Sequence, residues 1–167
     1  MAISAQPMNS QLLELIGAVV LSTQDAERCL KAILPFTDSD DPSIAGALMR
    51  HEKLKKRTLG DLVGRFVSKA HSKSDGLERH LASLVDRRNE IVHHFSDVYG
   101  QQLRDGDSKQ VIATLRLLLA DINAFRHALE QVVLLQFEAI RDTAFIGTPE
   151  HKEMDDICST FRLRVAS

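Results

Sequence analysis

The stretch Lys109–Phe145, KQVIATLRLLLADINAFRHALEQVVLLQFEAIRDTAF, decides the fold class, because it contains neither proline nor glycine. Its apolar residues recur in a near-heptad rhythm, the spacing of one helix face, with polar Gln136 as the exception. At about 1.5 Å per residue it predicts a helix roughly 50 Å long, so we expect its end to kink or to pack on a partner. The expected inner face comprises Val111, Leu115, Leu118, Ile122, Phe125, Leu129, Val132, Ala139 and Thr143.

Helical spacing continues outward from this stretch, and turn residues divide it. Pro35 ends the first expected helix, and residues 96–107, with two glycines, predict the longest loop. Thr58, with Asp61 three residues later, is typical of a helix start whose two side chains exchange bonds with the backbone. Further helices are expected over Ser10 to Leu34, Pro42 to Lys56, Thr58 to Ala70 and Asp75 to Phe95, with a short one starting at Thr148-Pro149 after Gly147.

Together these patterns predict an all-α protein. We expect an up-and-down helical bundle of about five helices with one long C-terminal helix, forming a single domain over residues 1–167. The 44% hydrophobic content, with no tryptophan and one tyrosine, favours a core of aliphatic side chains between helices. A chain of 167 residues is long enough to close one such core.

Composition also excludes several function classes. The net charge of -2 argues against whole-molecule attraction to nucleic acid but leaves room for a local basic patch. Cys29 and Cys158 are too few for a disulfide framework, and Cys29 is interpreted as a small core residue. No secretory signal and no apolar run of membrane-spanning length is evident, so we expect a cytoplasmic protein without a membrane partner.

One position breaks the apolar pattern of the fourth expected helix. Position 88 lies at the centre of the arc, and it is an arginine. A buried guanidinium needs partners, because it cannot shed its charge. Either Arg88 reaches an edge or pairs with a buried carboxylate, or the arc surrounds a cleft or subunit interface where an anion binds. The arc around it is formed by Leu77, Leu81, Leu84, Ile91, Val92 and Phe95.

Asn89 and His93 lie four residues apart on one flank of the same helix, next to Arg88. This set of side chains suits a phosphodiester. An arginine offers fixed charge and two donors to the phosphate oxygens, and a histidine can take or give a proton near neutral pH. The residues therefore permit phosphate chemistry, although arginine and histidine also occur at this spacing by chance.

The segment Leu84-Val-Asp-Arg-Arg-Asn-Glu-Ile-Val-His-His-Phe95 resembles the signature of HEPN (higher eukaryotes and prokaryotes nucleotide-binding) domains. Arg88-Asn89-Glu-Ile-Val-His93 has the form R-N-x-x-x-H near the end of a helix. Thr58-Leu-Gly-Asp-Leu62 is similar to a segment that often precedes this motif in bacterial members. The resemblance covers about residues 10–145.

The resemblance implies a homodimer whose motif helices face each other across a cleft, and a metal-independent ribonuclease without cofactors. The 2′-hydroxyl of RNA would attack the adjacent phosphate, leaving a cyclic phosphate and a 5′-hydroxyl. His93 would move the proton, Arg88 would stabilise the phosphate, and Asn89 would assist. Many bacterial members are toxins or antiviral effectors, which implies a neutralising antitoxin or regulatory partner. Others are inactive nucleotide-binding, protein-binding or dimerisation modules.

Some toxins of this family carry a tyrosine two residues after the histidine, where a partner nucleotidyltransferase modifies it. This chain has Phe95 there, which argues against such control. Arg87 and His94 could each lengthen the motif by one residue. We interpret them instead, with Glu90, as an ion-pair stripe on the solvent side.

Lys55, Lys56 and Arg57 are the candidate substrate-binding residues. They end the densest basic stretch, which begins at Arg50 and includes Lys53, and which is either a solvated helix end or a place for RNA-backbone contacts. Tyr99, in the expected loop, either packs that loop or touches substrate. The histidines are scattered and no Cys-x-x-Cys or His-x-x-x-His pair occurs, so we expect no metal site.

Overall fold

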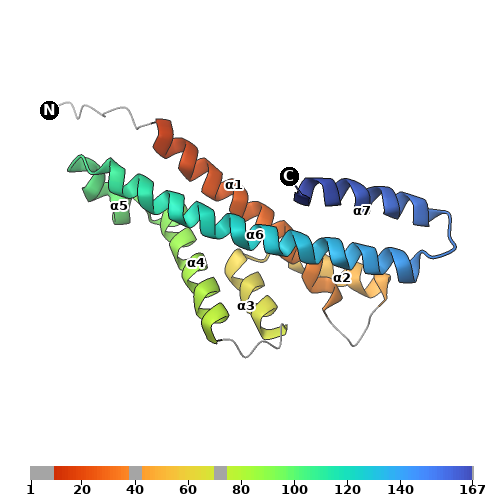
Figure 1. Cartoon of the computed structure of the whole chain (residues 1–167). Helices are drawn as coiled ribbons and strands as arrows, with labels where there is room; N and C mark the ends of the chain where they lie inside the picture. The colour runs from red at the N-terminus through yellow and green to blue at the C-terminus, as the bar shows by residue number, and fades with distance from the viewer. Residues whose placement is uncertain (1–9, 38–42, 70–74, 167) are drawn as a thin grey trace. The chain divides into compact units, whose positions relative to one another are not determined.

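The computed structural model of the chain describes residues 10–37, 43–69 and 75–166, and it is all-α over these ranges (Figure 1). This confirms the predicted fold class. The count of about five helices is wrong, because seven α-helices and one 3-10 helix occur in the described ranges. They are α1 (Ser10–Ile33), η1 (Leu34–Phe36), α2 (Ile44–Leu54), α3 (Leu59–Lys69), α4 (Asp75–His93), α5 (Phe95–Arg104), α6 (Ser108–Ala144) and α7 (Glu150–Ala166).

Local chemistry explains the helix ends. Pro35 lies in η1, directly after α1, where its missing N–H cannot continue an α-helix. The Ser43 hydroxyl accepts a hydrogen bond from the Gly46 N–H (3.0 Å) at the start of α2. The predicted start at Thr58 is confirmed, because its hydroxyl accepts a bond from the Asp61 N–H (3.4 Å) before α3. The expected bounds Pro42 and Ala70, and the link at 71–74, lie outside the described residues.

The loop predicted at 96–107 is wrong, because most of it forms helix α5. α4 ends at His93, the chain bends at His94, and α5 starts at Phe95. Gly100 is tolerated inside α5, whereas Gly106, with φ +83°, terminates it. The Gly106 and Asp107 N–H groups bond to carbonyls three and five residues earlier, which is a Schellman ending.

The long helix α6 is confirmed, but its inner face is predicted only in part. Positions 111, 115, 118, 122 and 129 are buried, whereas Val132 is 39% exposed and Ala139 and Thr143 are also exposed. Further along, the buried residues are Glu130, Val133 and Leu134. An α-helix drifts by about 20° per heptad, so a strict heptad face turns outward after three repeats.

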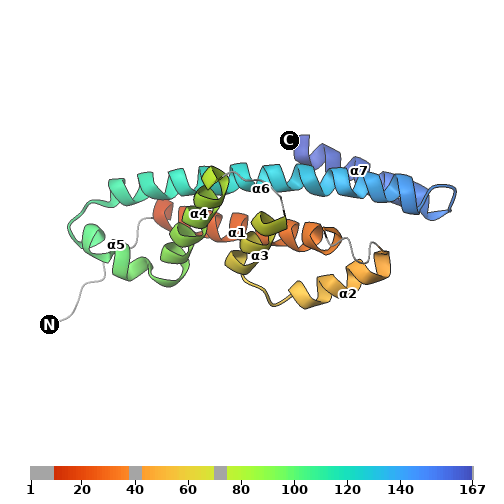
Figure 2. The ribbon, with the colours of Figure 1, turned by 90° about the horizontal axis from the view of Figure 1, so that it is seen from below.

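The end of α6 packs on a partner, as expected, and the partner is the chain's own α7. The chain reverses at Gly147, where φ is +76°, and α7 runs back beside α6 (Figures 1 and 2). Arg141 of α6 pairs with Asp155 of α7 at 2.7 Å, and Glu138 pairs with Arg162. The last helix therefore spans 17 residues rather than being short, and the long helix is not the C-terminal one. The Thr148 hydroxyl bonds back to the Phe145 carbonyl rather than capping α7.

The chain divides into two compact units that alternate along the sequence. Unit 1 consists of Met1–Gln24 and Ser74–Asn123, and unit 2 of Asp25–Lys73 and Ala124–Ser167. Unit 1 contains α4 and α5, and unit 2 contains η1, α2, α3 and α7. α1 and α6 contribute residues to both units.

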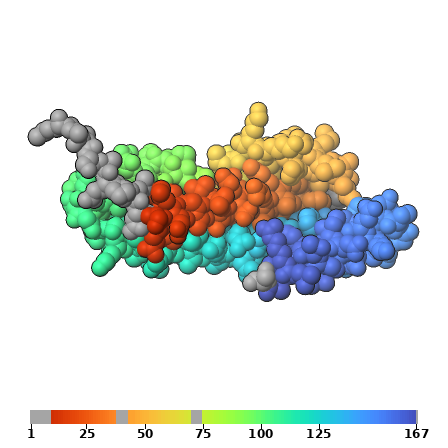
Figure 3. All heavy atoms as spheres, turned by 90° about the horizontal axis from the view of Figure 1, so that it is seen from above, coloured from red at the N-terminus to blue at the C-terminus, as the bar shows by residue number. Residues whose placement is uncertain are grey.

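Within unit 2, α2 and α3 lie against the 3-10 turn that follows α1 (Figure 2). α7 adjoins the second part of α1 at the surface (Figure 3). Gln136, the polar exception on α6, is half-buried here and donates to the Ile33 carbonyl at 3.4 Å. No helix in the described part of the chain is long and apolar enough to cross a bilayer.

Candidate active site

The site lies at the end of α4, in unit 1. Leu81, Leu84 and Ile91 on this helix are buried, as predicted, while Leu77 at its start is 39% exposed. Arg88 is half-buried, and its Nε atom is shielded from solvent. The arginine therefore lies at the margin of the apolar face, neither sealed in the core nor fully in water.

Arg88 contacts its neighbour directly. Its Nη1 atom donates to the Asn89 side-chain oxygen at 3.1 Å. Position 89 is one-quarter turn around the helix from position 88, so this bond draws the guanidinium toward the flank that carries Asn89 and His93. Two of the three predicted site residues are thus joined by a hydrogen bond.

His93 is the last residue of α4 and is exposed. It lies one turn beyond Asn89 on the same flank, which places its ring at the open end of the site. The ring contacts that of His94 edge-on, with centroids 6.3 Å apart. Because the helix ends here, the imidazole is accessible to a molecule that approaches α4 from solvent.

Arg87 corrects one of the sequence interpretations. It is not part of a solvent-side stripe with Glu90 and His94, because its Nη1 atom lies 2.7 Å from the Asp121 Oδ2 atom on α6. Both side chains are about one-third exposed (32% and 37%). His94 instead lies 3.8 Å from Asp97, at the start of α5. Arg87 thus holds α4 against α6.

Glu90 also turns inward, toward Tyr99 of α5. Tyr99 is 8% exposed, its ring packs on Phe95 with centroids 5.3 Å apart, and its hydroxyl bonds to the Glu90 carboxylate. Burial raises the pKa of Tyr99, and the negative charge of Glu90 raises it further. Tyr99 is therefore a packing residue of a helix, and its predicted place in a loop is wrong.

Asp121, and the Glu90–Tyr99 bond, are the parts of this site that sequence reasoning missed. Asp121 carried one signal, since it is a carboxylate directly before the buried Ile122 in an otherwise apolar stretch. Three residues near the end of α4 each bond to a different partner. Arg87 bonds to α6, Arg88 to Asn89, and Glu90 to α5. These contacts fix the backbone that presents Arg88 and His93.

The arrangement combines a positioned cation with an accessible proton carrier. Arg88 supplies permanent charge and planar donors for anionic oxygens. His93 is exposed and can exchange a proton with a bound group. Asn89 already accepts from Arg88 through its oxygen, so its amide nitrogen is the atom that can donate to a ligand. The set suits an anionic, phosphate-bearing substrate.

The predicted substrate-binding residues belong to unit 2, so the structure does not join them to the motif. Lys55, Lys56 and Arg57 follow α2 and are all exposed. Lys55 pairs with Glu52 at 2.6 Å, and Arg57 lies 3.6 Å from Asp61. Their role in substrate binding remains a prediction.

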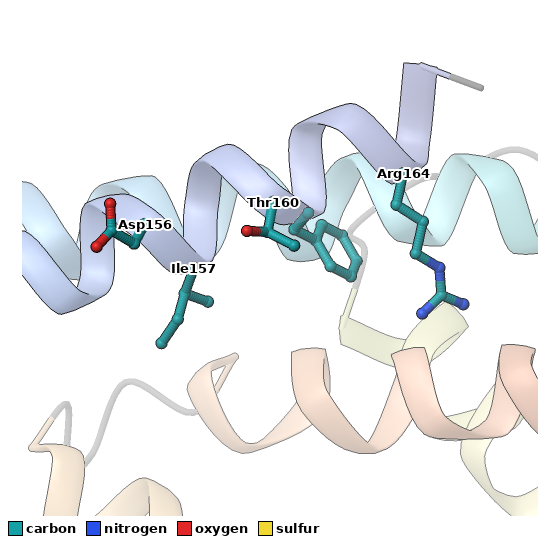
Figure 4. Close-up of a pocket in the computed structure, with 5 residues that line it drawn as sticks. Asp156, Ile157, Thr160 and Arg164 are labelled. Carbon is teal, nitrogen blue, oxygen red and sulfur yellow. The ribbon is translucent and has the colours of Figure 1, made fainter.

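Two hollows beside α7, also in unit 2, are lined by other residues. One, of about 390 Å³, lies along α7, where Ile157 and Arg164 point to the same side (Figure 4). The second, of about 200 Å³, lies between α1, α6 and α7 and is bordered by Cys29 and Glu130. Cys29 is half-buried rather than in the core.

In the ranges that the structure describes, no three acidic, histidine or cysteine side chains are grouped so as to hold a metal ion. Comparison with protein-family models, with curated proteins and with solved structures finds no match to this chain.

Proposed function

We propose that this protein is a homodimeric, metal-independent endoribonuclease of the HEPN type, a helical bundle whose two motif helices form the cleft. The observation that carries the proposal is the half-buried Arg88, hydrogen-bonded to Asn89, one turn before the exposed His93 at the end of α4. One subunit presents this set on an open helix end. A second copy, facing it, would enclose the substrate phosphate.

In the proposed reaction, His93 takes the proton from the RNA 2′-hydroxyl, and that oxygen attacks the adjacent phosphorus. The bond from phosphorus to the 5′-oxygen breaks, and this oxygen takes a proton from water, while protonated His93 returns its proton to solvent. The products are a 2′,3′-cyclic phosphate and a 5′-hydroxyl. Arg88 stabilises the negative charge that accumulates on the phosphate oxygens, and the Asn89 amide orients the phosphate.

We also propose the wider role that the resemblance implies. The protein would act in the cytoplasm as a toxin or antiviral-defence effector, under control of an antitoxin or regulatory protein. Lys55, Lys56 and Arg57 would contact the RNA backbone beyond the cleavage point. Each of these statements depends on RNA cleavage by the purified protein.

The test uses the full chain with mixed RNA in EDTA. We expect wild type to cleave, and His93→Ala and Arg88→Ala to lose about a hundredfold or more in rate. His94→Ala is the matched control, because it removes a neighbouring exposed imidazole and should leave the rate unchanged. RNA with 2′-deoxy sugars should resist cleavage, and the products should end in cyclic phosphate.

Cleavage that survives in both motif variants, or that EDTA abolishes, would contradict the proposal. No cleavage by wild type, combined with a homodimer in solution, would favour the alternative of an inactive binding or dimerisation module. Arg88→Met separates both from a purely structural arginine. If Arg88 only packs the helix, this variant should unfold at the same or a higher urea concentration.

A further inference from the structure

The docking of α7 onto α6, within unit 2, depends on few buried side chains. Of the 17 residues of α7, only Cys158 and Val165 are buried. α3, in the same unit, buries three residues in a helix of 11. Ile157 and Leu163 of α7 are exposed, so a large part of its apolar surface has no neighbour. Apolar burial therefore holds α7 less firmly than it holds α3.

The packing beneath α7 is also incomplete. A hollow of about 200 Å³ lies between α1, α6 and α7, where Phe137 and Phe161 meet edge-on with ring centroids 6.2 Å apart. A second hollow, of about 390 Å³, runs along α7 and shares Phe161 and Arg164 with the first (Figure 4). Side chains that border a hollow lose contacts on that side. The interface thus has gaps where a tightly packed helix would have neighbours.

Three ion pairs also join α6 to α7. In each pair the α7 member is more than half exposed (53%, 54% and 60%), so water and dissolved ions weaken the attraction. Contacts of this kind become weaker as ionic strength rises. The pairs, with the α6 member first, are Arg141–Asp155, Glu138–Arg162 and Glu130–Arg164.

Two of the three α6 charges have a second partner on α6 itself. Arg141 lies 2.7 Å from Asp142, and Glu130 lies 2.7 Å from Arg126. This matters most for Glu130, which is 3% exposed, because a buried carboxylate without a partner is strongly destabilising. Release of α7 would leave both charges paired. The bonds to α7 can therefore open without the penalty that usually keeps a buried ion pair closed.

The connection between α6 and α7 has the features of a hinge. It comprises residues 145–149, and the N–H and hydroxyl of Thr148 both donate to the Phe145 carbonyl inside it. Gly147 reverses the chain with φ +76°, a conformation that residues with a Cβ atom rarely adopt. α7 can move about this glycine without loss of the bonds between Thr148 and Phe145.

We propose that α7 is a strap that detaches from α6 about the Gly147 turn while the rest of unit 2 stays folded, and that ionic strength sets how often it detaches. Local opening of this kind occurs where buried contacts are few. Detachment uncovers Cys158, which is 0% exposed when α7 is docked, so the strap controls access to this thiol. The inference does not rest on the ribonuclease proposal, whose residues belong to unit 1.

Hydrogen exchange of the full chain, followed by mass spectrometry, measures how often α7 opens. At about 0.05 M salt we expect the α7 amides to exchange more than tenfold faster than the α6 amides near Val133, each relative to its rate in an unfolded chain. An increase to about 0.5 M salt should speed exchange in α7 by about threefold or more, because screening weakens the ion pairs. The α6 amides should not respond.

Two charge-matched variants test whether the ion pairs hold α7. Arg162→Gln removes one pair between α6 and α7, so it should speed exchange in α7 by about twofold or more and reduce the response to salt. Arg57→Gln removes the same charge from an exposed pair with Asp61 elsewhere in unit 2. This control should leave exchange in α7 unchanged.

Two glycine variants test the hinge. Gly147→Ala strains the closed turn, so α7 should open about fivefold more often or beyond. Gly106→Ala introduces the same kind of strain at φ +83° in unit 1 and should leave α7 unchanged. If Gly147→Ala also left α7 unchanged, opening would not occur about this turn, and the proposal would be wrong.

Cys158 gives a second readout that is independent of the amides. It lies in the middle of α7, so fraying of the helix ends would not expose it. In a Cys29→Ala variant, we expect a thiol reagent to label Cys158 without denaturant. The labelling rate should rise with salt by the same factor as the exchange rate of the α7 amides.

Three further results would overturn the proposal. Equal protection of the α7 and α6 amides would show that α7 leaves only when the whole unit unfolds. Exchange in α7 that ignores both salt and Arg162→Gln would show that apolar contacts alone hold the helix. Labelling of Cys158 only at urea concentrations that unfold the whole protein would show that α7 frays at its ends and does not detach.

Discussion

The Arg87 Nη1 atom lies 2.7 Å from the Asp121 Oδ2 atom, and this ion pair joins the motif helix α4 to α6. Arg87 directly precedes Arg88, so the pair fixes the rotation of α4 about its axis at the point where the candidate site begins. A contact with no catalytic part thus sets where the catalytic candidates point.

Removal of this ion pair should cost little stability. Both side chains are about one-third exposed, so we expect Asp121→Asn to lower the free energy of unfolding by about 0.5 kcal/mol. Urea unfolding of wild type, Asp121→Asn, Arg87→Gln and the double variant measures the coupling between the two residues. A loss that is fully additive in the double variant would show that the pair contributes nothing.

Tyr99 should make the fold sensitive to alkali. Burial and then the charge of Glu90 raise the pKa of Tyr99, so the folded state favours the neutral phenol. Its contribution to stability is complete below the ordinary pKa of about 10 and is lost as pH rises through the higher folded pKa. We expect the Tm of wild type to fall more steeply above pH 10 than that of Tyr99→Phe.

Tyr99 is the chain's only tyrosine, and there is no tryptophan, so phenolate absorbance reports this residue alone. Titration of the folded protein should give an apparent pKa above that measured in urea. Glu90→Gln should reduce the difference, because it removes the neighbouring negative charge. Identical titration curves in the folded and urea-unfolded protein would refute the raised pKa.

Glu130 and Arg126 should respond unequally to substitution. Glu130 is 3% exposed and lies 2.7 Å from Arg126 and 3.7 Å from Arg164, whose side chains are 28% and 60% exposed. Arg126→Leu leaves the buried Glu130 carboxylate with Arg164 as a more distant partner, and we expect the free energy of unfolding to fall by about 2 kcal/mol. Glu130→Leu leaves two arginines whose side chains can turn toward water. We therefore expect this variant to lose less than half as much unfolding free energy as Arg126→Leu. Urea unfolding that ranks Glu130→Leu as the more damaging change would contradict this account.

Cys29 should alkylate slowly. Burial, and then the negative charge of Glu130, raise the pKa of its thiol to about 11, from an ordinary value near 9. At pH 8 the thiolate fraction falls about a hundredfold, and the greater nucleophilicity of the more basic thiolate recovers about tenfold, so we expect roughly a tenfold slower reaction. Iodoacetamide labelling of a Cys158→Ala variant, followed by mass spectrometry, measures it. A folded rate equal to that in urea would disprove the shift.

Much of the fold was predictable because helix signals are local. Pro35 ends α1, Thr58 starts α3, and the absence of proline and glycine in residues 109–145 predicts α6. α5 was missed because Gly100 and Gly106 carry the same weight in a sequence, yet only Gly106 takes a positive φ. Which of two glycines breaks a helix depends on the contacts of the finished structure.

Only the part of the candidate site that depends on local sequence spacing was predictable. The half-buried position of Arg88 follows from its place among apolar residues spaced along one helix. The partner of Arg87 does not, because Asp121 lies 34 residues later and nothing in one sequence pairs the two. The inner face of α6 was predicted only in part, because a seven-residue repeat does not match a helix of 3.6 residues per turn, so positions seven residues apart rotate gradually away from the core.

The alternation of the two units along the chain has a practical consequence for fragments of this protein. Because the backbone passes between the units at Gln24, Lys73 and Asn123, no single cut separates the two units from each other. A fragment that stops at Lys73 holds pieces of both and completes neither. A nonsense mutation before α7 would leave unit 1 entire but would deprive unit 2 of its last helix.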